Sequence, residues 1–459
     1  MKARIKKLFC VLLTTIMLFP SMTTFAASDK VTTNSVPTKD GILSKLDTIN
    51  SNLSDADVLE KHEISSLVDA QIKSYIQTES LSDNTTISHS EENLWIPLYD
   101  LNGNHFADLV PLIDENGNDI GFITIGSIRD GFPYYMLSWD TEFIPSYRNA
   151  LESHPQSQAI FLPPMDYGLQ TGHGSNRRIW KFNMSDFSLH DTTTTVAKNA
   201  EFFESTYNSI RSVDNATKTA RDLSGDEQYM TSASKSVSVE DVRLSCEWND
   251  SIFAPVTEVK NGKTITYYGG DQAWFNDDRS TTGCGPVAAA NIMYYLSLSS
   301  SKYENLYPYS SASKALFTIF MGTMYKQINP SSWFGEASYS SFADDTVKWA
   351  KGRNVNLTVH KAMITFDGKI PITNGIKDGL RKDKPVAIVN LNKWYHDETA
   401  NADVGWHWVT VTKYYQSSSD KRWIAVSTWG KRLSLNWDAY YQSMADPLPS
   451  LGGGYVWFE

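Results

Sequence analysis

Ser280-Thr281-Thr282-Gly283-Cys284-Gly285-Pro286, followed by the apolar run Val287-Ala288-Ala289-Ala290-Asn291-Ile292-Met293-Tyr294-Tyr295-Leu296, carries the strongest local signal in this 459-residue chain. Proline is favoured at the first position of a helix, where its missing N–H is not needed, and alanine has the highest helix propensity. The sequence therefore predicts a helix that begins at or just after Cys284. The N–H groups and the dipole at such an end stabilise a thiolate and lower a thiol pKa. Cys284 is therefore predicted to be a nucleophile, and a buried structural cysteine is the alternative.

A thiolate nucleophile needs an imidazole that takes up its proton. Three histidines follow Cys284 in the C-terminal half of the chain, namely His360, His396 and His407. His407 has the best context, because residues 405–412 are typical of a strand that begins beside a turn and would hold the ring rigidly. His396 lies in a polar segment with the character of a loop, and His360 ends a candidate strand. We predict His407 as the general base, with His360 and His396 as alternatives.

The next predicted strand, residues 423–430, follows within the length of a hairpin and ends in Trp429-Gly430. A Gly-Cys-Gly-Pro helix start, a histidine on a strand and a strand ending in Trp-Gly resemble the papain-like cysteine peptidase superfamily. The resemblance is greatest to its bacterial bacteriocin-processing-type and streptopain-like branches, and it covers roughly residues 271–457. It implies an α+β fold, in which a nucleophile helix packs against an antiparallel sheet that bears the histidine. Cys284 matches the nucleophile of this family and His407 its general base.

The resemblance implies two further site residues. Gln272 is similar to the glutamine whose side-chain amide helps to form the oxyanion hole, although a loop insertion must separate it from the cysteine. Ser427 occupies the position at which papain-like enzymes have the asparagine that orients the imidazole. A hydroxyl can accept the imidazole N–H, but without the charge of an aspartate, so this position departs from the family pattern. Further candidates for the same role are Thr428, Asn436 and Asp438.

A different kind of sequence precedes the predicted enzyme domain. Residues 40–78 have the periodicity of amphipathic helices, and residues 94–162 are typical of short strands joined by Asn-Gly turns. The Asp and Asn residues of these turns do not complete an EF-hand pattern, so hairpins are expected rather than calcium sites. Ser, Thr, Asp and Lys dominate the segment that follows, which indicates a linker. The expected parts are a smaller helix-plus-β-hairpin domain at 28–211, a linker at 212–240 and a papain-like domain at 241–459.

The first 27 residues are predicted to be a signal peptide, with a basic head, an apolar run over residues 8–19 and small residues at Ala26-Ala27. No later apolar run is long enough to span a bilayer, so we expect a secreted bacterial protein, extracellular or at the cell surface, without a transmembrane segment. Cys246 and Cys284 are the two cysteines that follow the signal peptide. A disulfide between them is the alternative to a reactive thiol.

The composition argues against several classes of protein. With 41% hydrophobic and 12% aromatic residues, the chain has the composition of a globular protein. Its formal net charge is −11, and it has no basic stripe with interleaved aromatic residues, so no nucleic-acid partner is expected. The sequence has no His-Glu-x-x-His motif, no paired Cys-x-x-Cys motif and no glycine-rich phosphate loop. We therefore expect neither a metal nor another cofactor.

These observations predict a secreted cysteine peptidase that hydrolyses a polypeptide substrate through a Cys-His thiolate–imidazolium dyad. We expect it to be made as a zymogen, with the N-terminal region packed on the catalytic domain. A peptidoglycan amidase or acyltransferase on the same fold remains an alternative, because a Cys-His pair does not separate these chemistries. A catalytically inactive surface or binding protein is the other alternative, and the absence of Asn or Asp at Ser427 favours it.

Overall fold

The computed structural model describes residues 57–79, 86–172, 176–211, 240–249, 251–328, 337–364, 372–390, 407–418, 421–445 and 453–459. All of these residues belong to one compact unit, Lys39–Glu459. Three predicted features lie outside the described residues: the signal peptide at 1–27, almost all of the linker at 212–240, and His396. Within the described ranges the fold is α+β with a large mixed sheet, which confirms the predicted fold class at this level.

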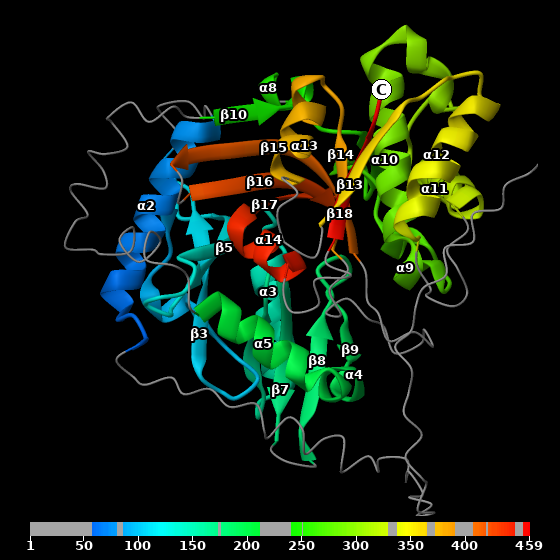
Figure 1. Ribbon diagram of the computed structural model, residues 1–459. Helices are drawn as coiled ribbons and strands as arrows, with labels where there is room; N and C mark the ends of the chain where they lie inside the picture. Colours follow the sequence, from blue (N-terminus) through cyan, green and yellow to red (C-terminus); the bar gives the residue numbers. More distant parts are fainter. Residues whose placement is uncertain are drawn as a thin grey trace, which may run out of the picture. The chain divides into compact units, whose positions relative to one another are not determined.

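One sheet contains strands from both halves of the sequence (Figure 1). Its main order is β13-β18-β14-β15-β16-β17-β5-β4-β3-β2-β6-β7-β8-β9, with β1 beside β3 and β10 beside β15. Adjacent strands of the described sheet are antiparallel except for β2 and β6, which run parallel. The earlier strands are β1 (Ser88–His89), β2 (Ile96–Tyr99), β3 (His105–Ile113), β4 (Asp119–Gly126), β5 (Tyr134–Ser138), β6 (Gln158–Leu162), β7 (Asp166–Thr171), β8 (Arg178–Phe182) and β9 (Leu189–Asp191). The later strands are β10 (Glu240–Arg243), β13 (Val359–Met363), β14 (Val386–Asn390), β15 (His407–Ser418), β16 (Lys421–Thr428), β17 (Lys431–Asn436) and β18 (Gly453–Phe458), while β11 (Pro255–Lys260) and β12 (Lys263–Tyr268) form a separate hairpin.

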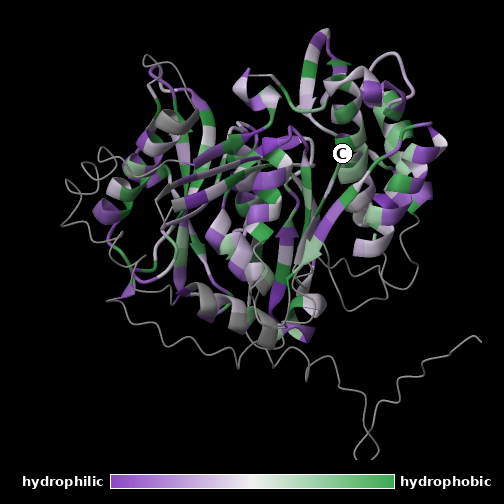
Figure 2. Cartoon of the chain, turned by 45° about the horizontal axis from the view of Figure 1, so that its top comes forward, coloured by the Kyte–Doolittle hydropathy of each residue, from purple (hydrophilic) through white to green (hydrophobic). Residues whose placement is uncertain are grey.

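Helices cover this sheet, and Figure 2 shows that they carry both hydrophilic and hydrophobic residues, as expected of helices with one buried face. The α-helices are α2 (Lys61–Glu79), α3 (Phe143–Ser153), α4 (Thr193–Lys198), α5 (Ala200–Arg211), α8 (Ser245–Trp248), α9 (Arg279–Thr282), α10 (Cys284–Ser299), α11 (Lys314–Ile328), α12 (Tyr339–Gly352), α13 (Ile372–Arg381) and α14 (Trp437–Ala445). The 3₁₀ turns of the described ranges are η3 (Glu92–Leu94), η6 (Gln272–Trp274) and η7 (Ser301–Leu306). Helix α10 is buried along its length from Cys284 to Leu296, and it packs between β15 on one side and α11 and α12 on the other.

The two Asn-Gly segments form the turns between β2 and β3 and between β3 and β4. In the first, the side chain of Asp100 accepts hydrogen bonds from the backbone N–H groups of Asn102 and Asn104 at 2.8 and 2.9 Å. Asp114 makes the equivalent bonds in the second turn. Gly103 and Gly117 adopt φ values of 84° and 78°, which residues with a side chain rarely adopt. The Asp oxygens therefore hold the turn backbone itself.

The halves of the sequence on either side of residues 212–239 meet in one sheet. Strand β17 pairs with β5, so Leu433 lies opposite Ser138 and Leu435 opposite Met136. A hydrophobic cluster also combines apolar residues of α2 and β3–β5 with Tyr415 and Trp423 of the later strands. The two halves therefore share a backbone ladder and a hydrophobic core.

A chain cut once between Arg211 and Glu240 is expected to stay associated, because the β5–β17 ladder and the shared core do not depend on that connection. Size-exclusion chromatography without denaturant should show both fragments in one peak, and a denaturing gel should separate them. Elution of the two fragments in separate peaks under native conditions would contradict this prediction.

Candidate active site

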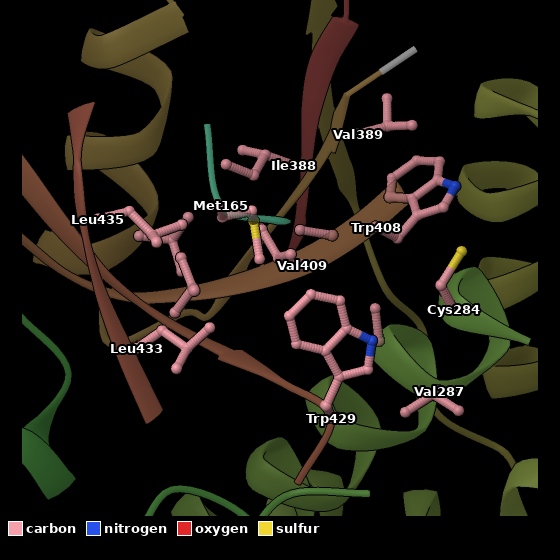
Figure 3. Close-up of a cluster of buried hydrophobic side chains, with 14 of the residues drawn as sticks. Met165, Cys284, Val287, Ile388, Val389, Trp408, Val409, Trp429, Leu433 and Leu435 are labelled. Carbon is pink, nitrogen blue, oxygen red and sulfur yellow. The ribbon is translucent and has the colours of Figure 1, made fainter. Parts of the chain in front are cut away.

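Cys284 is the first residue of α10, and Gly283 caps the helix. The cysteine is 5% exposed, and no disulfide joins it to Cys246. Gly285 lets Ala337 and Trp408 pack closely against the backbone of α10. A Cβ atom added at Gly285 would stand 2.7 Å from the side chain of Ala337 and 3.2 Å from the ring of Trp408. Figure 3 shows the sulfur of Cys284 directed from the helix start toward the indole of Trp408.

His407 is the first residue of β15 and is 4% exposed. Its Nε2 lies 3.0 Å from Oγ1 of Thr428, and its ring stacks on Trp429 with the ring centroids 5.0 Å apart. Burial, with a smaller contribution from the charge of Lys181, lowers the pKa of His407 to about 3. In this arrangement the imidazole is neutral at neutral pH.

Trp408 fixes the start of β15 against the start of α10. Its indole Nε1 donates a hydrogen bond to the carbonyl oxygen of Ala337 at 3.1 Å, and its ring stacks on Phe342 with centroids 4.0 Å apart. The neighbouring backbone of Gly285 lies against the same indole. The strand that begins with His407 and the helix that begins with Cys284 are therefore held together at one buried place.

The hydroxyl that contacts His407 belongs to Thr428, whereas the resemblance pointed to Ser427. The Ser427 hydroxyl donates to the carbonyl oxygen of Tyr268 at 2.6 Å. Ser427 pairs with Thr410, three residues beyond His407, and successive residues of a strand face opposite sides of the sheet. Thr428 therefore lies on the imidazole side of the sheet, and Ser427 lies on the other side.

The other two candidates for the orienting role have different partners. Asn436 donates to the carbonyl oxygen of Tyr134 at 2.8 Å, and its side-chain oxygen accepts from the first N–H groups of α14. Asp438 forms an ion pair with Arg422. Among the hydroxyl, amide and carboxyl groups considered for this role, the structure brings Thr428 to His407.

Gln272 lies in η6, where its side-chain amide donates to the carbonyl oxygen of Ser280 at 2.9 Å. The loop around it is fixed from two sides. The carboxylate of Asp271 accepts from the N–H of Ala273 at 2.9 Å, and the N–H of Gly270 donates to the side-chain oxygen of Asn291 in α10 at 2.7 Å. The amide of Gln272 is thus held against the segment that leads into Cys284.

His360 lies away from the start of α10, on β13 at the end of the sheet order. Its ring stacks on Trp457 with centroids 3.8 Å apart, and its Nε2 lies 3.0 Å from a carboxylate oxygen of Glu459. These contacts give His360 a structural place at the sheet edge. His396, the other alternative base, lies outside the described residues.

Residues of α14 and of the N-terminal region also lie near Cys284 and His407, although no sequence motif marks them. Burial raises the pKa of Tyr440, and Asp166 and Cys284 add to this effect through their charges, so the phenol lies near both. The charge of Lys181 contributes to the lowered pKa of His407, so Lys181 lies near the imidazole. In the sequence, Asp166 is marked only as an acidic residue that directly follows the apolar segment ending in Pro163-Pro164-Met165, and in the structure it begins β7.

The described ranges contain no group of three or more His, Cys, Asp or Glu residues that could hold a metal ion. None of the helices in the described parts of the chain is long and apolar enough to cross a bilayer. No protein-family model matches the chain, and no curated protein matches it.

Proposed function

We propose that this protein is a secreted cysteine peptidase that hydrolyses peptide bonds with Cys284 as nucleophile and His407 as general base. One observation carries the proposal: the start of the buried helix α10 and the start of β15 are packed together, with a cysteine at the first and a histidine at the second. The contact between Thr428 and His407 supports it, because an imidazole used as a base has to be held in one orientation.

The reaction follows from these positions. Thr428 occupies Nε2 of His407, so the proton of the Cys284 thiol would pass to Nδ1. The thiolate, stabilised by the helix N-terminus, would add to the peptide carbonyl carbon, and the oxyanion would accept hydrogen bonds from the N–H of Cys284 and the amide of Gln272. The imidazolium would then protonate the leaving amine, and water would hydrolyse the thioester with His407 again as base.

The state described by the structure is consistent with a zymogen. Cys284 and His407 are both almost completely buried, and a histidine with a pKa of about 3 does not hold the thiol proton at neutral pH. An active form would need a more exposed and more basic His407. The same two features also favour a second candidate function, a catalytically inactive binding protein, so the test has to separate the two.

Alkylation of the intact chain by iodoacetamide tests the proposal, because the chain carries its own reference thiol. Burial and the neighbouring Glu247 raise the pKa of Cys246 to about 12, so this residue should react slowly at pH 7.5. Cys284 is expected to react at least ~10-fold faster, because the helix N-terminus stabilises its thiolate and the thiolate is the reacting species. His407→Ala should change this rate little in the intact chain, since the neutral imidazole of this state does not hold the thiol proton. Equal rates for the two cysteines would favour the inactive binding protein.

A further inference from the structure

The β11–β12 hairpin lies outside the large sheet, and its two edges differ in how their backbone groups are used. On the β11 edge, the N–H of Thr257 donates to the carbonyl oxygen of Ala312 at 2.9 Å. On the β12 edge, the N–H of Tyr268 donates to the carbonyl oxygen of Gly430 at 2.8 Å. The remainder of β12 up to residue 266 is exposed, so this part of its edge faces solvent.

The register of the hairpin shows which backbone groups point outward. In an antiparallel ladder, pairs that exchange hydrogen bonds alternate with pairs whose N–H and C=O groups point away from each other. Thr257 bonds outward and pairs with Thr266, so the backbone groups of Thr266 point outward from β12, and those of Thr264 follow by alternation. Within the described ranges, no backbone group bonds to the outward N–H and C=O of Thr264 or Thr266.

This open edge has few of the features that prevent edge strands from pairing, such as bulges, prolines and charges along the strand. The ladder runs from the pair of Pro255 and Tyr268 to the pair of Lys260 and Lys263 without a register shift. Residues 264–267 are Thr-Ile-Thr-Tyr, all of which favour extended structure, and the two lysines stand only at the tip. The edge is therefore suited to accept one more extended strand.

The open edge leads toward the proposed active site. Tyr268 bonds to Gly430, and the residue before it, Trp429, stacks on His407 with the ring centroids 5.0 Å apart. At its end, β12 continues into the loop that holds Gln272. An extended chain paired with β12 would therefore end beside the Trp429-Gly430 turn, next to two residues of the proposed site.

We propose that the open edge of β12 binds the polypeptide substrate as an added extended strand, whose backbone exchanges hydrogen bonds with Thr264 and Thr266. This inference rests on the proposed function, because the occupant is the substrate of that site. Recognition through the backbone favours an extended, unfolded segment over a fixed sequence. A second copy of the chain fits less well, because two outward residues offer far less than the roughly 800 Å² per partner that a stable interface buries.

Binding of an unfolded polypeptide to the full-length Cys284→Ala chain tests this proposal without relying on hydrolysis. The probe is reduced, carboxymethylated α-lactalbumin, and fluorescence anisotropy measures its affinity. Thr266→Pro and Thr264→Pro each remove an outward N–H and leave the internal bonds of the hairpin in place, so each should weaken binding about fivefold. Hydrogen exchange of the Thr264 and Thr266 amides should slow when the probe binds.

Val259→Pro is the matched control. Val259 is 74% exposed and pairs with Thr264, so its N–H points outward from the opposite edge of the same hairpin. The substitution should leave the affinity unchanged, and the Val259 amide should exchange at the same rate with and without the probe. Equal losses for Val259→Pro and Thr266→Pro would mean that loosening of the hairpin, and not its open edge, weakens binding.

Three further results separate this inference from the proposed peptidase. Unchanged affinity in both threonine variants, together with unprotected Thr264 and Thr266 amides, would overturn the edge as a substrate site. A concentration-dependent dimer of the wild-type chain that Thr266→Pro abolishes would overturn it in favour of a second copy. Edge binding by a wild-type chain that hydrolyses no peptide bond would overturn the proposed peptidase and support the polypeptide site.

Discussion

Cys284→Ala is expected to abolish peptide-bond hydrolysis by this chain, because the substitution removes the atom that would form the thioester. His407→Ala should lower turnover by several orders of magnitude, since His407 begins the strand that packs against α10 and is the proposed base. A peptide library digested by the full chain, with the products identified by mass spectrometry, measures both effects. Cys246→Ala is the matched control. It removes the second thiol, whose pKa of about 12 makes it a poor nucleophile, and should leave the set of cleaved bonds unchanged.

Hydrolysis that survives Cys284→Ala would exclude a thiol mechanism at this site. Wild-type protein that cleaves nothing, before and after trimming of the N-terminal region, would favour the inactive binding protein. Cleavage that needs Cys284 but is restricted to cell-wall peptides would support the amidase alternative and would leave the roles of Cys284 and His407 intact.

Local sequence signals correctly predicted where helix α10 and strand β15 begin. Gly-Cys-Gly-Pro followed by alanines predicted a helix start, and α10 begins at Cys284. The turn before a run of β-formers predicted a strand with His407 near its beginning, and β15 begins at His407. Both predictions depend on a few consecutive residues, so no distant contact was needed to make them.

Features that depend on pairing between distant strands were not predictable in the same way. The side of the sheet on which Ser427 and Thr428 lie follows from the register of β16 against β15, and that ladder contains an irregularity between Val411 and Lys413. The pairing of β17 with β5 joins residues about three hundred positions apart. The approach of Lys181 to His407 and of Asp166 to Tyr440 depends on the same long-range arrangement, so it left no recognisable motif.

Glu247→Gln is expected to destabilise the fold strongly, because it breaks a buried ion pair that joins α8 to β17. The carboxylate accepts hydrogen bonds from Nε and Nη2 of Arg432 at 3.1 and 2.9 Å, from the hydroxyl of Thr412 at 2.6 Å and from the hydroxyl of Tyr268. Its side chain is 6% exposed and that of Arg432 is 15% exposed. Removal of one partner leaves a buried guanidinium without its counter-charge, which typically costs about 3–5 kcal/mol.

The pH dependence of unfolding gives this prediction a second readout. Burial alone would raise the pKa of Glu247, but the charge of Arg432 and the hydrogen bonds outweigh it and lower the pKa to about 2. An unfolded glutamate titrates near 4.3, so the stabilisation is complete above that pH and is lost as the pH falls toward 2. The shift corresponds to about 3 kcal/mol. Urea unfolding curves of wild type and Glu247→Gln should therefore differ most at neutral pH and should converge in acid.

Glu258→Gln is the matched control for this substitution. Glu258 pairs with Lys314 at 3.0 Å, but both side chains are about one-third exposed, so water screens their attraction and the loss should stay below about 1 kcal/mol. Adding Arg432→Met to Glu247→Gln should recover part of the lost stability, because the guanidinium that was left without its counter-charge is then removed as well. Equal losses for Glu247→Gln and Glu258→Gln would mean that the Glu247–Arg432 pair is hydrated in solution, and the link between α8 and β17 would then depend on apolar contacts alone.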